Sequence, residues 1–260
     1  MSPLSASSVD ATIYHLCLLT LYLISLPTFL ALHFIQAPYG RHRRSGWGPT
    51  IPSWLSWLLM ESPTIFFSLL IYPFGQFSSS LRSFSLLAVF LLHYFHRTVV
   101  YPLRLRRKTT SDFPISVSLM AFSFNLLNSY VQTRWISNYC DYGLDEWFRG
   151  RFSGGMVVFG FGMVVNVKSD LVLVGLKAQG GGYKIPRSGL FELVSSPNYL
   201  GEIIEWLGWA IMSWSWAGFG FFLYTSCNLV PRAMANHNWY LEKFKDEYPK
   251  NRKAIIPFLY

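Results

Sequence analysis

Long apolar runs constrain this chain more than any other feature of its sequence. A helix needs roughly 20 apolar residues to cross the hydrocarbon core of a membrane, and 52% of the 260 residues are hydrophobic while only 13% are charged. Runs of that length occupy residues 12–34, 51–73, 81–101, 114–136 and 152–173. A further stretch, 199–230, is too long for one span, and "SWSWAG" at 213–218 divides it into two helices. The sequence therefore predicts an all-α integral membrane protein of about seven transmembrane helices, folded as a single polytopic domain over residues 1–260.

Basic residues fall on alternate loops between these runs. Cytoplasmic loops of membrane proteins collect Lys and Arg, and here the loops after the first, third, fifth and seventh runs carry them, whereas the loop at 138–151 contains three acidic residues. This pattern predicts a lumenal N-terminus and a cytosolic C-terminus. The net charge of +9 fits either topology alone or an anionic ligand on the cytosolic face. The basic residues are Arg41, Arg43, Arg44, Arg104, Arg106, Arg107, Lys108, Lys168, Lys177, Lys184, Arg187, Arg232, Lys243, Lys245, Lys250, Arg252 and Lys253.

Polar side chains also lie inside the predicted spans, where an ionisable group costs at least about 2.5 kcal/mol unless it faces a partner or a wet cavity. Glu61 is near the middle of the second run and is followed by Pro63, which removes a backbone hydrogen bond. Tyr94 belongs to "HYFHRT", residues 93–98 of the third run. At about 1.5 Å per residue, Glu61 lies roughly 15 Å and Tyr94 roughly 11 Å from the cytosolic ends of their helices. Their similar depth favours a shared cavity.

A second polar group gathers where the fifth run reaches the cytosol. Asn166 and Asp170 are four residues apart and share one helix face. Beyond them, "LKAQGGGYKIPRSGLF" at 176–191 combines two lysines and an arginine with three consecutive glycines. Glycine allows close backbone approach, and Lys and Arg suit phosphate oxygens, so an anionic nucleotide fits this loop. A flexible basic loop at a membrane surface has the same composition and is the alternative.

Several familiar motifs are incomplete in this chain. "GFGMVV" at 160–165 begins like a dinucleotide-binding glycine motif, but it lies inside a predicted membrane helix with no preceding strand. Gly155, Gly160 and Gly162 are therefore interpreted as sites of close helix packing. The three cysteines are too widely separated for a zinc site or a disulfide framework, and the sequence contains no nucleic-acid module. We expect neither a metal nor a nucleic-acid partner.

Five stretches, in order along the chain, resemble the steroid 5α-reductases. The resemblance runs from about residue 36 to the last residue and is most specific in the C-terminal part, about 110–260. The loops "YGRHRRSGWGP" and "QGGGYKIPRSGLFE" are similar to those of the plant members, which act in brassinosteroid biosynthesis. The five stretches are "LLMESPT" (58–64), "HYFHRT" (93–98), "VNVKSD" (165–170), "SSPNYLGEIIEW" (195–206) and "WYLEKFKDEYPKNRKAIIPFLY" (239–260).

The resemblance implies a seven-helix enzyme of the endoplasmic reticulum membrane that reduces the 4,5 double bond of 3-oxo-Δ4 steroids with NADPH. Hydride addition to an enone builds negative charge on the carbonyl oxygen, and the resemblance assigns Glu61 and Tyr94 as the catalytic pair that donates to that oxygen. Glu61 donates only when protonated, a state that burial in hydrocarbon favours. By the same resemblance the cofactor-binding residues are Arg97, Asn166, Asp170, Lys177, Tyr183, Lys184, Asn198, Glu202, Arg232 and Tyr240.

Some positions depart from the family pattern or have no role in it. Met60 stands where animal-type enzymes have a glutamine, and Lys177 stands where they have an arginine, which keeps the charge but loses bidentate phosphate geometry. Glu202 is implied to lie at the nicotinamide end of the cofactor. Glu205 has no implied role, and we expect it to pair with an intramembrane base such as Arg97 or His96.

Two other functions remain open from the sequence. Reductases of enoyl-CoA and of polyprenols share the cofactor end of this superfamily and differ in the substrate half, where "LLMESPT" and "HYFHRT" favour steroids. A non-catalytic membrane partner of a reductase would tolerate changes at Asn166 and Glu202. Keeping so many polar groups in a membrane without catalytic use makes that alternative unfavourable.

Overall fold

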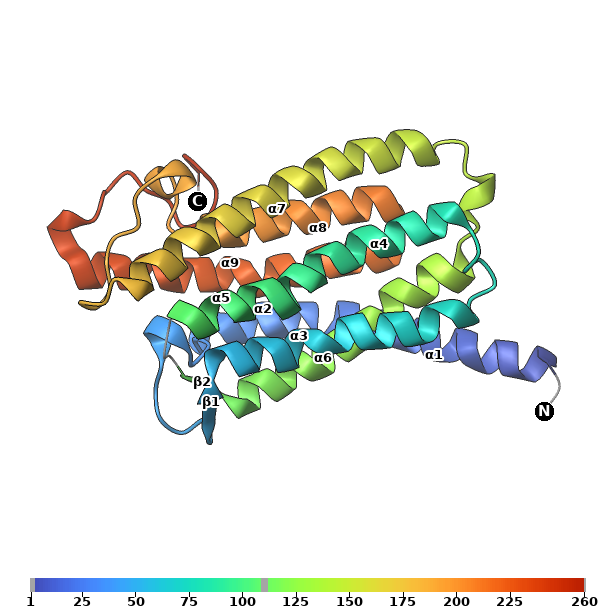
Figure 1. Cartoon of the computed structure of the whole chain (residues 1–260), viewed down its shortest axis with the longest axis horizontal. Coiled ribbons are helices and arrows are strands. Elements are labelled where there is room, and N and C mark those ends of the chain that lie inside the picture. Colours follow the sequence, from blue (N-terminus) through green and yellow to red (C-terminus); the bar gives the residue numbers. More distant parts are fainter. Residues whose placement is uncertain (1–2, 109–111, 260) are drawn as a thin grey trace.

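Long helices run side by side along one axis in the computed structural model, which describes residues 3–108 and 112–259 (Figure 1). Two π-helical turns directly follow α4 and α6 and extend these helices: His96–Val100 and Trp135–Tyr139. The helices are α1 (Pro3–Leu23), α2 (Ser25–Phe34), α3 (Ser53–Ile71), α4 (Leu81–Phe95), α5 (Tyr101–Lys108), α6 (Ile115–Arg134), α7 (Phe148–Ala178), α8 (Pro197–Ser213) and α9 (Trp216–Phe244). The predicted all-α class is confirmed.

Among the residues that the structure describes, four helical segments are long and apolar enough to cross a membrane: 8–34, 53–74, 81–107 and 148–178. They coincide with the first, second, third and fifth predicted runs. The remaining predicted spans are helical as α6, α8 and α9, although they are shorter or more polar. Large apolar side chains such as Leu26, Phe66 and Leu70 are exposed on the outside of the bundle, as lipid-facing side chains would be.

The break between α8 and α9 lies within the stretch that the sequence marked. Trp214 has φ 43°, in the left-handed region where a bulky residue is uncommon, so the helix ends there. Ser215 then caps α9 by accepting a hydrogen bond at its hydroxyl from the backbone N–H of Gly218 at 2.9 Å. The predicted division of 199–230 into two helices is confirmed.

The short sheet and most of the basic loops gather at one end of the bundle (Figure 1). Strands β1 (Thr50–Pro52) and β2 (Asp112–Pro114) pair antiparallel, with Ile51 opposite Phe113. The N-terminus of α1 lies toward the other end of the molecule. Short 3₁₀ turns complete the connections at Gly40–His42, Tyr72–Phe74, Tyr142–Leu144, Gly189–Glu192 and Lys245–Glu247.

Glycines bring α7 and α8 into backbone contact. A Cβ atom on Gly162 would lie 2.3 Å from the backbone nitrogen of Glu205, and one on Gly201 would lie 2.5 Å from the backbone nitrogen of Asn166. Gly155 has the same close approach, so the packing interpretation is confirmed for Gly155 and Gly162. It is wrong for Gly160, which faces open space because it lies on the other side of α7.

The C-terminal segment holds the loop before α8 in place. The backbone N–H of Ser195 donates to the carbonyl of Lys253 at 2.8 Å, and the two segments run parallel there. Arg252 donates to the Pro186 carbonyl at 2.9 Å and pairs with Glu192 at 3.2 Å. Glu192 also accepts the backbone N–H of Ser188, and these two contacts hold the pKa of its carboxyl below the ordinary value.

Candidate active site

One cavity of about 600 Å³ opens between α2, α3, α4, α6, α7, α8 and α9. All but Asn166 of the predicted site residues line it, although they come from several different helices and loops. The lining therefore brings together Glu61, Tyr94, Arg97, Asp170, Lys177, Tyr183, Lys184, Asn198, Glu202, Arg232 and Tyr240. Asn166 is buried behind this surface, where its amide nitrogen donates to the Asn198 carbonyl at 3.0 Å and to a Glu202 carboxyl oxygen at 3.4 Å.

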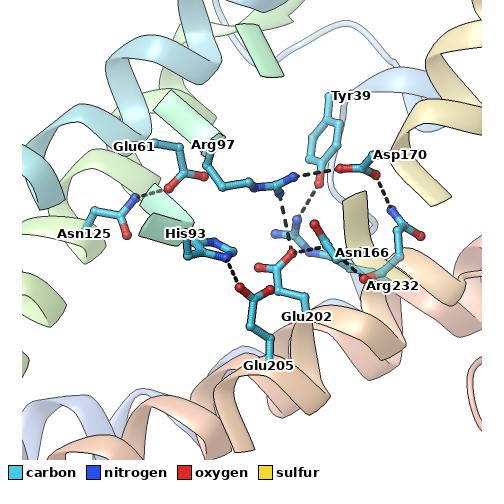
Figure 2. Close-up of polar contacts among 11 residues, drawn as sticks. Tyr39, Glu61, His93, Arg97, Asn125, Asn166, Asp170, Glu202, Glu205 and Arg232 are labelled. Atoms are coloured by element: carbon cyan, nitrogen blue, oxygen red, sulfur yellow. Dashed lines mark hydrogen bonds and ion pairs between the residues drawn. The ribbon is translucent and has the colours of Figure 1, made fainter. Parts of the chain in front are cut away.

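Glu61 is held at the cavity by α6. Its carboxyl accepts a hydrogen bond from the Asn125 amide at 3.0 Å (Figure 2), and the same amide donates to the Met60 carbonyl at 2.6 Å. Pro63 has no N–H for the Leu59 carbonyl, and the Ser62 hydroxyl donates to that carbonyl instead at 3.1 Å. The backbone defect beside Glu61 is therefore repaired by a side chain, and the helix continues.

Tyr94 is buried among aromatic rings with its hydroxyl group toward α6. The ring lies 5.0 Å from Phe90 and 5.8 Å from Trp206, centroid to centroid. The Asn128 amide nitrogen lies 3.4 Å from the phenol oxygen, and the Thr64 hydroxyl is also a neighbour. Tyr94 and Glu61 thus line the same cavity, as their depths in the sequence predicted.

Arg97 forms the centre of the polar network. Its guanidinium donates to Asp170 at 2.9 Å and lies 3.5 Å from Glu202, so it bridges α7 and α8 (Figure 2). The Trp57 ring lies under the guanidinium carbon at 4.3 Å, a cation–π contact. Arg97 belongs to the π-helical turn after α4, and such turns frequently occur at functional sites. Arg97 therefore meets two acidic partners.

The Glu205 partner differs from the one we expected. Glu205 is fully buried, and its carboxyl lies 2.8 Å from Nδ1 of His93 (Figure 2). Among the described residues, neither Arg97 nor His96 forms an ion pair with it. The other carboxyl oxygen of Glu205 has no hydrogen-bond partner among the residues described. Arg97 is paired with Asp170 and Glu202 instead, so it is not the partner of Glu205.

The basic end of the cavity carries cations and aromatic rings. Arg232 donates to the Tyr39 hydroxyl at 2.6 Å, and Arg41 lies over the Tyr240 ring at 4.4 Å. Within the described parts of the chain, one guanidinium nitrogen of Arg41 and the Nε of Arg232 are buried without hydrogen-bond partners. The three glycines at 180–182 all have positive φ, which only glycine adopts easily. Orphaned guanidinium donors beside a glycine loop suit phosphate oxygens.

Several site residues were not predicted. Asn125, Asn128 and Gln132 lie one turn apart on one face of α6 and are all buried. The signal was present, because polar amides at spacings of three and four inside an apolar run indicate a face that avoids lipid. Tyr39 and Arg41 were also missed, although they occupy the loop "YGRHRRSGWGP" that carried part of the resemblance.

Comparisons with known proteins show which family this chain is similar to. Residues 111–260 match the model of the family described as 3-oxo-5-alpha-steroid 4-dehydrogenase. The chain is 62% identical to Steroid 5-alpha-reductase DET2 of Gossypium hirsutum, covering 96% of this chain and 99% of that protein. It is 56% identical to the protein of the same name in Arabidopsis thaliana, over 96% of this chain and 98% of that one. Identity to 3-oxo-5-alpha-steroid 4-dehydrogenase 1 of Homo sapiens is 42%, over 85% and 86% of the two chains.

Proposed function

The chain belongs to the 3-oxo-5-alpha-steroid 4-dehydrogenase family, and we propose that it reduces the 4,5 double bond of 3-oxo-Δ4 steroids to 5α-reduced 3-oxo steroids. The observation that carries the proposal is one cavity with Glu61 and Tyr94 at its apolar end and, at its basic end, two guanidinium groups that each keep a buried nitrogen without a hydrogen-bond partner among the described residues. Identities of 62% and 56% to two plant steroid 5-alpha-reductases, each over 96% of this chain, support a role in brassinosteroid biosynthesis.

The apolar end suits a flat, fused-ring lipid. Its walls are contributed by side chains of α3, β2 and α6 and present hydrocarbon and aromatic surface next to Glu61 and Tyr94. Burying a steroid against this surface removes apolar area from water and expels water from the reaction site. The residues of these walls are Met60, Phe113, Val117, Ala121 and Phe124.

Glu61 and Tyr94 act on the carbonyl oxygen. The Tyr94 hydroxyl and the protonated Glu61 carboxyl donate hydrogen bonds to the 3-oxo group, whose oxygen gains negative charge as the double bond is reduced. Donors that are already in place stabilise this charge more in the transition state than in the bound substrate, and each contributes about 100- to 1,000-fold in kcat. Asn125 fixes the direction of the Glu61 carboxyl because its amide nitrogen binds both that carboxyl and the Met60 carbonyl.

NADPH fits the basic end. When bound, it supplies the hydride that adds to the β carbon of the enone. Arg41, Arg232 and Lys177 would hold its phosphates, since the two guanidiniums have buried donors without partners among the described residues. Asn198 and Glu202 line the cavity together with Tyr94 and would orient the nicotinamide, with Asn166 fixing both of them from behind. The remaining residues that the resemblance gives, which line the same cavity, are proposed as further cofactor-binding residues: Arg97, Asp170, Tyr183, Lys184 and Tyr240.

Seven membrane spans in the endoplasmic reticulum complete the proposal. The N-terminus would be lumenal and the C-terminus cytosolic, with the basic end of the cavity open to cytosolic NADPH. The positions of the basic loops at one end of the bundle support this orientation (Figure 1). Glycosylation acceptor sites added at the N-terminus and in the loop at 138–151 should be modified, whereas one added at the C-terminus should not.

The experiment is steroid reduction by membranes that contain the protein. We expect 5α-reduced products from campestenone-like or progesterone-like 3-oxo-Δ4 steroids with NADPH, and a fall of about 100-fold or more in kcat for Glu61→Gln and for Tyr94→Phe. Tyr130→Phe is the matched control, because its hydroxyl contacts Asp10 away from the cavity. NADPH should also raise the melting temperature of the solubilised protein, and Arg41→Gln should reduce that shift. Reduction of an enoyl-CoA or a polyprenol in place of every steroid would contradict the proposal.

A further inference from the structure

A chain of buried side chains connects Tyr94 to the break between α8 and α9. The indole N–H of Trp209 donates to Oε1 of Gln132 at 2.9 Å. The Gln132 amide nitrogen donates to the carbonyl of Ala217 at 2.8 Å and to Oδ1 of Asn128 at 3.1 Å. The Asn128 amide nitrogen then lies 3.4 Å from the Tyr94 phenol oxygen. None of the five residues is more than 3% exposed, so water does not compete for these groups.

The chemistry of the far end fixes the direction of every bond in this chain. An indole nitrogen is only a donor and a backbone carbonyl is only an acceptor. Gln132 must therefore turn its oxygen toward Trp209 and its nitrogen toward Ala217 and Asn128. Asn128 receives a donor at its oxygen, so its nitrogen faces Tyr94. The opposite orientation of either amide would put two donors or two acceptors face to face in a dry interior.

We propose that Asn128 and Gln132 are positioning residues that set Tyr94 as a hydrogen-bond donor toward the substrate carbonyl. The Asn128 nitrogen occupies a lone pair of the phenol oxygen and cannot accept the phenol hydrogen. That hydrogen is left for an acceptor in the cavity that Tyr94 lines. This inference rests on the proposed function, since it concerns the donor that acts on the 3-oxo group.

The same arrangement strengthens the donor. A hydrogen bond accepted by the phenol oxygen polarises its O–H bond, and successive bonds in a chain reinforce one another. The Thr64 hydroxyl, which also neighbours Tyr94, can rotate to donate or to accept and so does not set a direction. Asn128 is thus the neighbour with a fixed polarity, and Trp209 and Ala217 determine it from two other helices.

Isosteric acids test the direction of the chain. Asn128→Asp places an acceptor against the phenol, which then donates to Asp instead of to the steroid, and kcat should fall roughly 100-fold, close to the value for Tyr94→Phe. Gln132→Glu removes the amide nitrogen that donates to Asn128, so the Asn128 amide can turn its oxygen toward Tyr94. This change should lower kcat in the same way, although residue 132 does not contact Tyr94. Asn128→Leu offers no acceptor and should lower kcat less, by about 3- to 10-fold.

A double-mutant cycle separates positioning from packing. In the Tyr94→Phe background, each acidic variant should lower kcat by less than about twofold further, because no phenol hydrogen remains to be redirected. Thr133→Val is the matched control on α6: it removes a buried hydrogen bond of 2.9 Å to Ser68 of α3, which is not part of the hydrogen-bond chain from Trp209 to Tyr94. Its kcat should stay within about twofold of wild type.

Three results would overturn the inference. The first is a wild-type kcat in Asn128→Asp. The second is a fall in kcat from Asn128→Asp that is equally large with and without Tyr94→Phe. The third is a fall in kcat from Asn128→Leu as large as that from Asn128→Asp. If the acidic variants do not accumulate in membranes, Asn128→Leu in both backgrounds decides the question, because its loss must disappear with the phenol. A wild-type protein that reduces no 3-oxo-Δ4 steroid overturns the proposed function itself, and this inference with it.

Discussion

Gly162→Ala should separate the two helices that carry most of the polar network. The new methyl group would lie 2.3 Å from the Glu205 backbone nitrogen and 2.6 Å from the Gly201 carbonyl oxygen. Ordinary contact begins at 3.4 Å, and both obstacles are backbone atoms, so α7 and α8 must part by about 1.1 Å at this level. The hydrogen bond from Asn166 to the Asn198 carbonyl, now 3.0 Å, would lengthen to about 4 Å and be lost.

Both stability and catalysis should respond to this separation. Overpacking of this kind destabilises a fold by about 1–3 kcal/mol, and a misplacement of about 1 Å at a reacting centre lowers the rate roughly 100-fold. We therefore expect a lower melting temperature in detergent and a kcat/KM for steroid reduction about 100-fold below wild type. The assay is product formation in membranes, normalised to the amount of reductase by immunoblot.

Gly160→Ala is the matched control on the same helix. A Cβ atom there meets nothing within 4 Å, and alanine is a better helix former than glycine by up to about 1 kcal/mol, so activity should be unchanged and stability equal or higher. Wild-type kcat/KM in Gly162→Ala, or an equal loss in both variants, would refute the reasoning that backbone contact between α7 and α8 aligns the site.

Three further perturbations follow from the contacts of single residues. Arg97→Met leaves the buried Asp170 carboxylate without its cation and should destabilise the protein by about 3–5 kcal/mol, seen as little folded protein in membranes, whereas Arg97→Lys should accumulate but lose activity. Glu205→Gln keeps a hydrogen bond to His93, so its free energy of unfolding should lie within about 1 kcal/mol of the wild-type value. Glu205→Leu leaves Nδ1 of His93 without a partner and should lower the free energy of unfolding by about 1–3 kcal/mol. Thermal unfolding measures both changes. Burial lowers the pKa of His42 from its ordinary 6.5, so the neutral form is favoured in the folded state and the melting temperature should decline as pH falls below 6.5, less steeply in His42→Gln.

Helix positions could be predicted from the sequence because a membrane imposes a length on each apolar run. The break at Trp214 was also visible, since "SWSWAG" interrupts a run that is too long for one span. The two π-helical turns were not, because one extra residue in a single turn is too short a change to leave a periodic signature in the sequence. Such turns rotate the side chains that follow them, and Arg97 lies in one of them.

Motifs in the sequence named residues that line the cavity, but they did not show which side chains those residues contact. Glu205 and His93 are 112 positions apart in the sequence, and a helix face offers His93, His96 and Arg97 alike. Which base meets Glu205 depends on how α4 is rotated against α8, and that rotation is set by the tertiary packing of glycines and aromatic rings. The amides of α6 were recognisable as an inward face, but their order as a chain of bonds required Trp209 and Ala217 from other helices.

The carboxyl groups that line the cavity differ in whether a cation lies beside them. Asp170 and Glu202 both lie within ion-pair distance of Arg97, which therefore joins the carboxyl groups of α7 and α8 in one charged network. Among the described residues, no cation lies within ion-pair distance of Glu61, whose carboxyl is bound by the neutral amide of Asn125. A carboxyl with a neutral donor in an apolar wall is better placed to carry a proton, and only a protonated carboxyl can donate to a developing oxyanion. A lysine or arginine in place of Asn125 would stabilise the carboxylate and remove that donor, so a neutral amide suits this position.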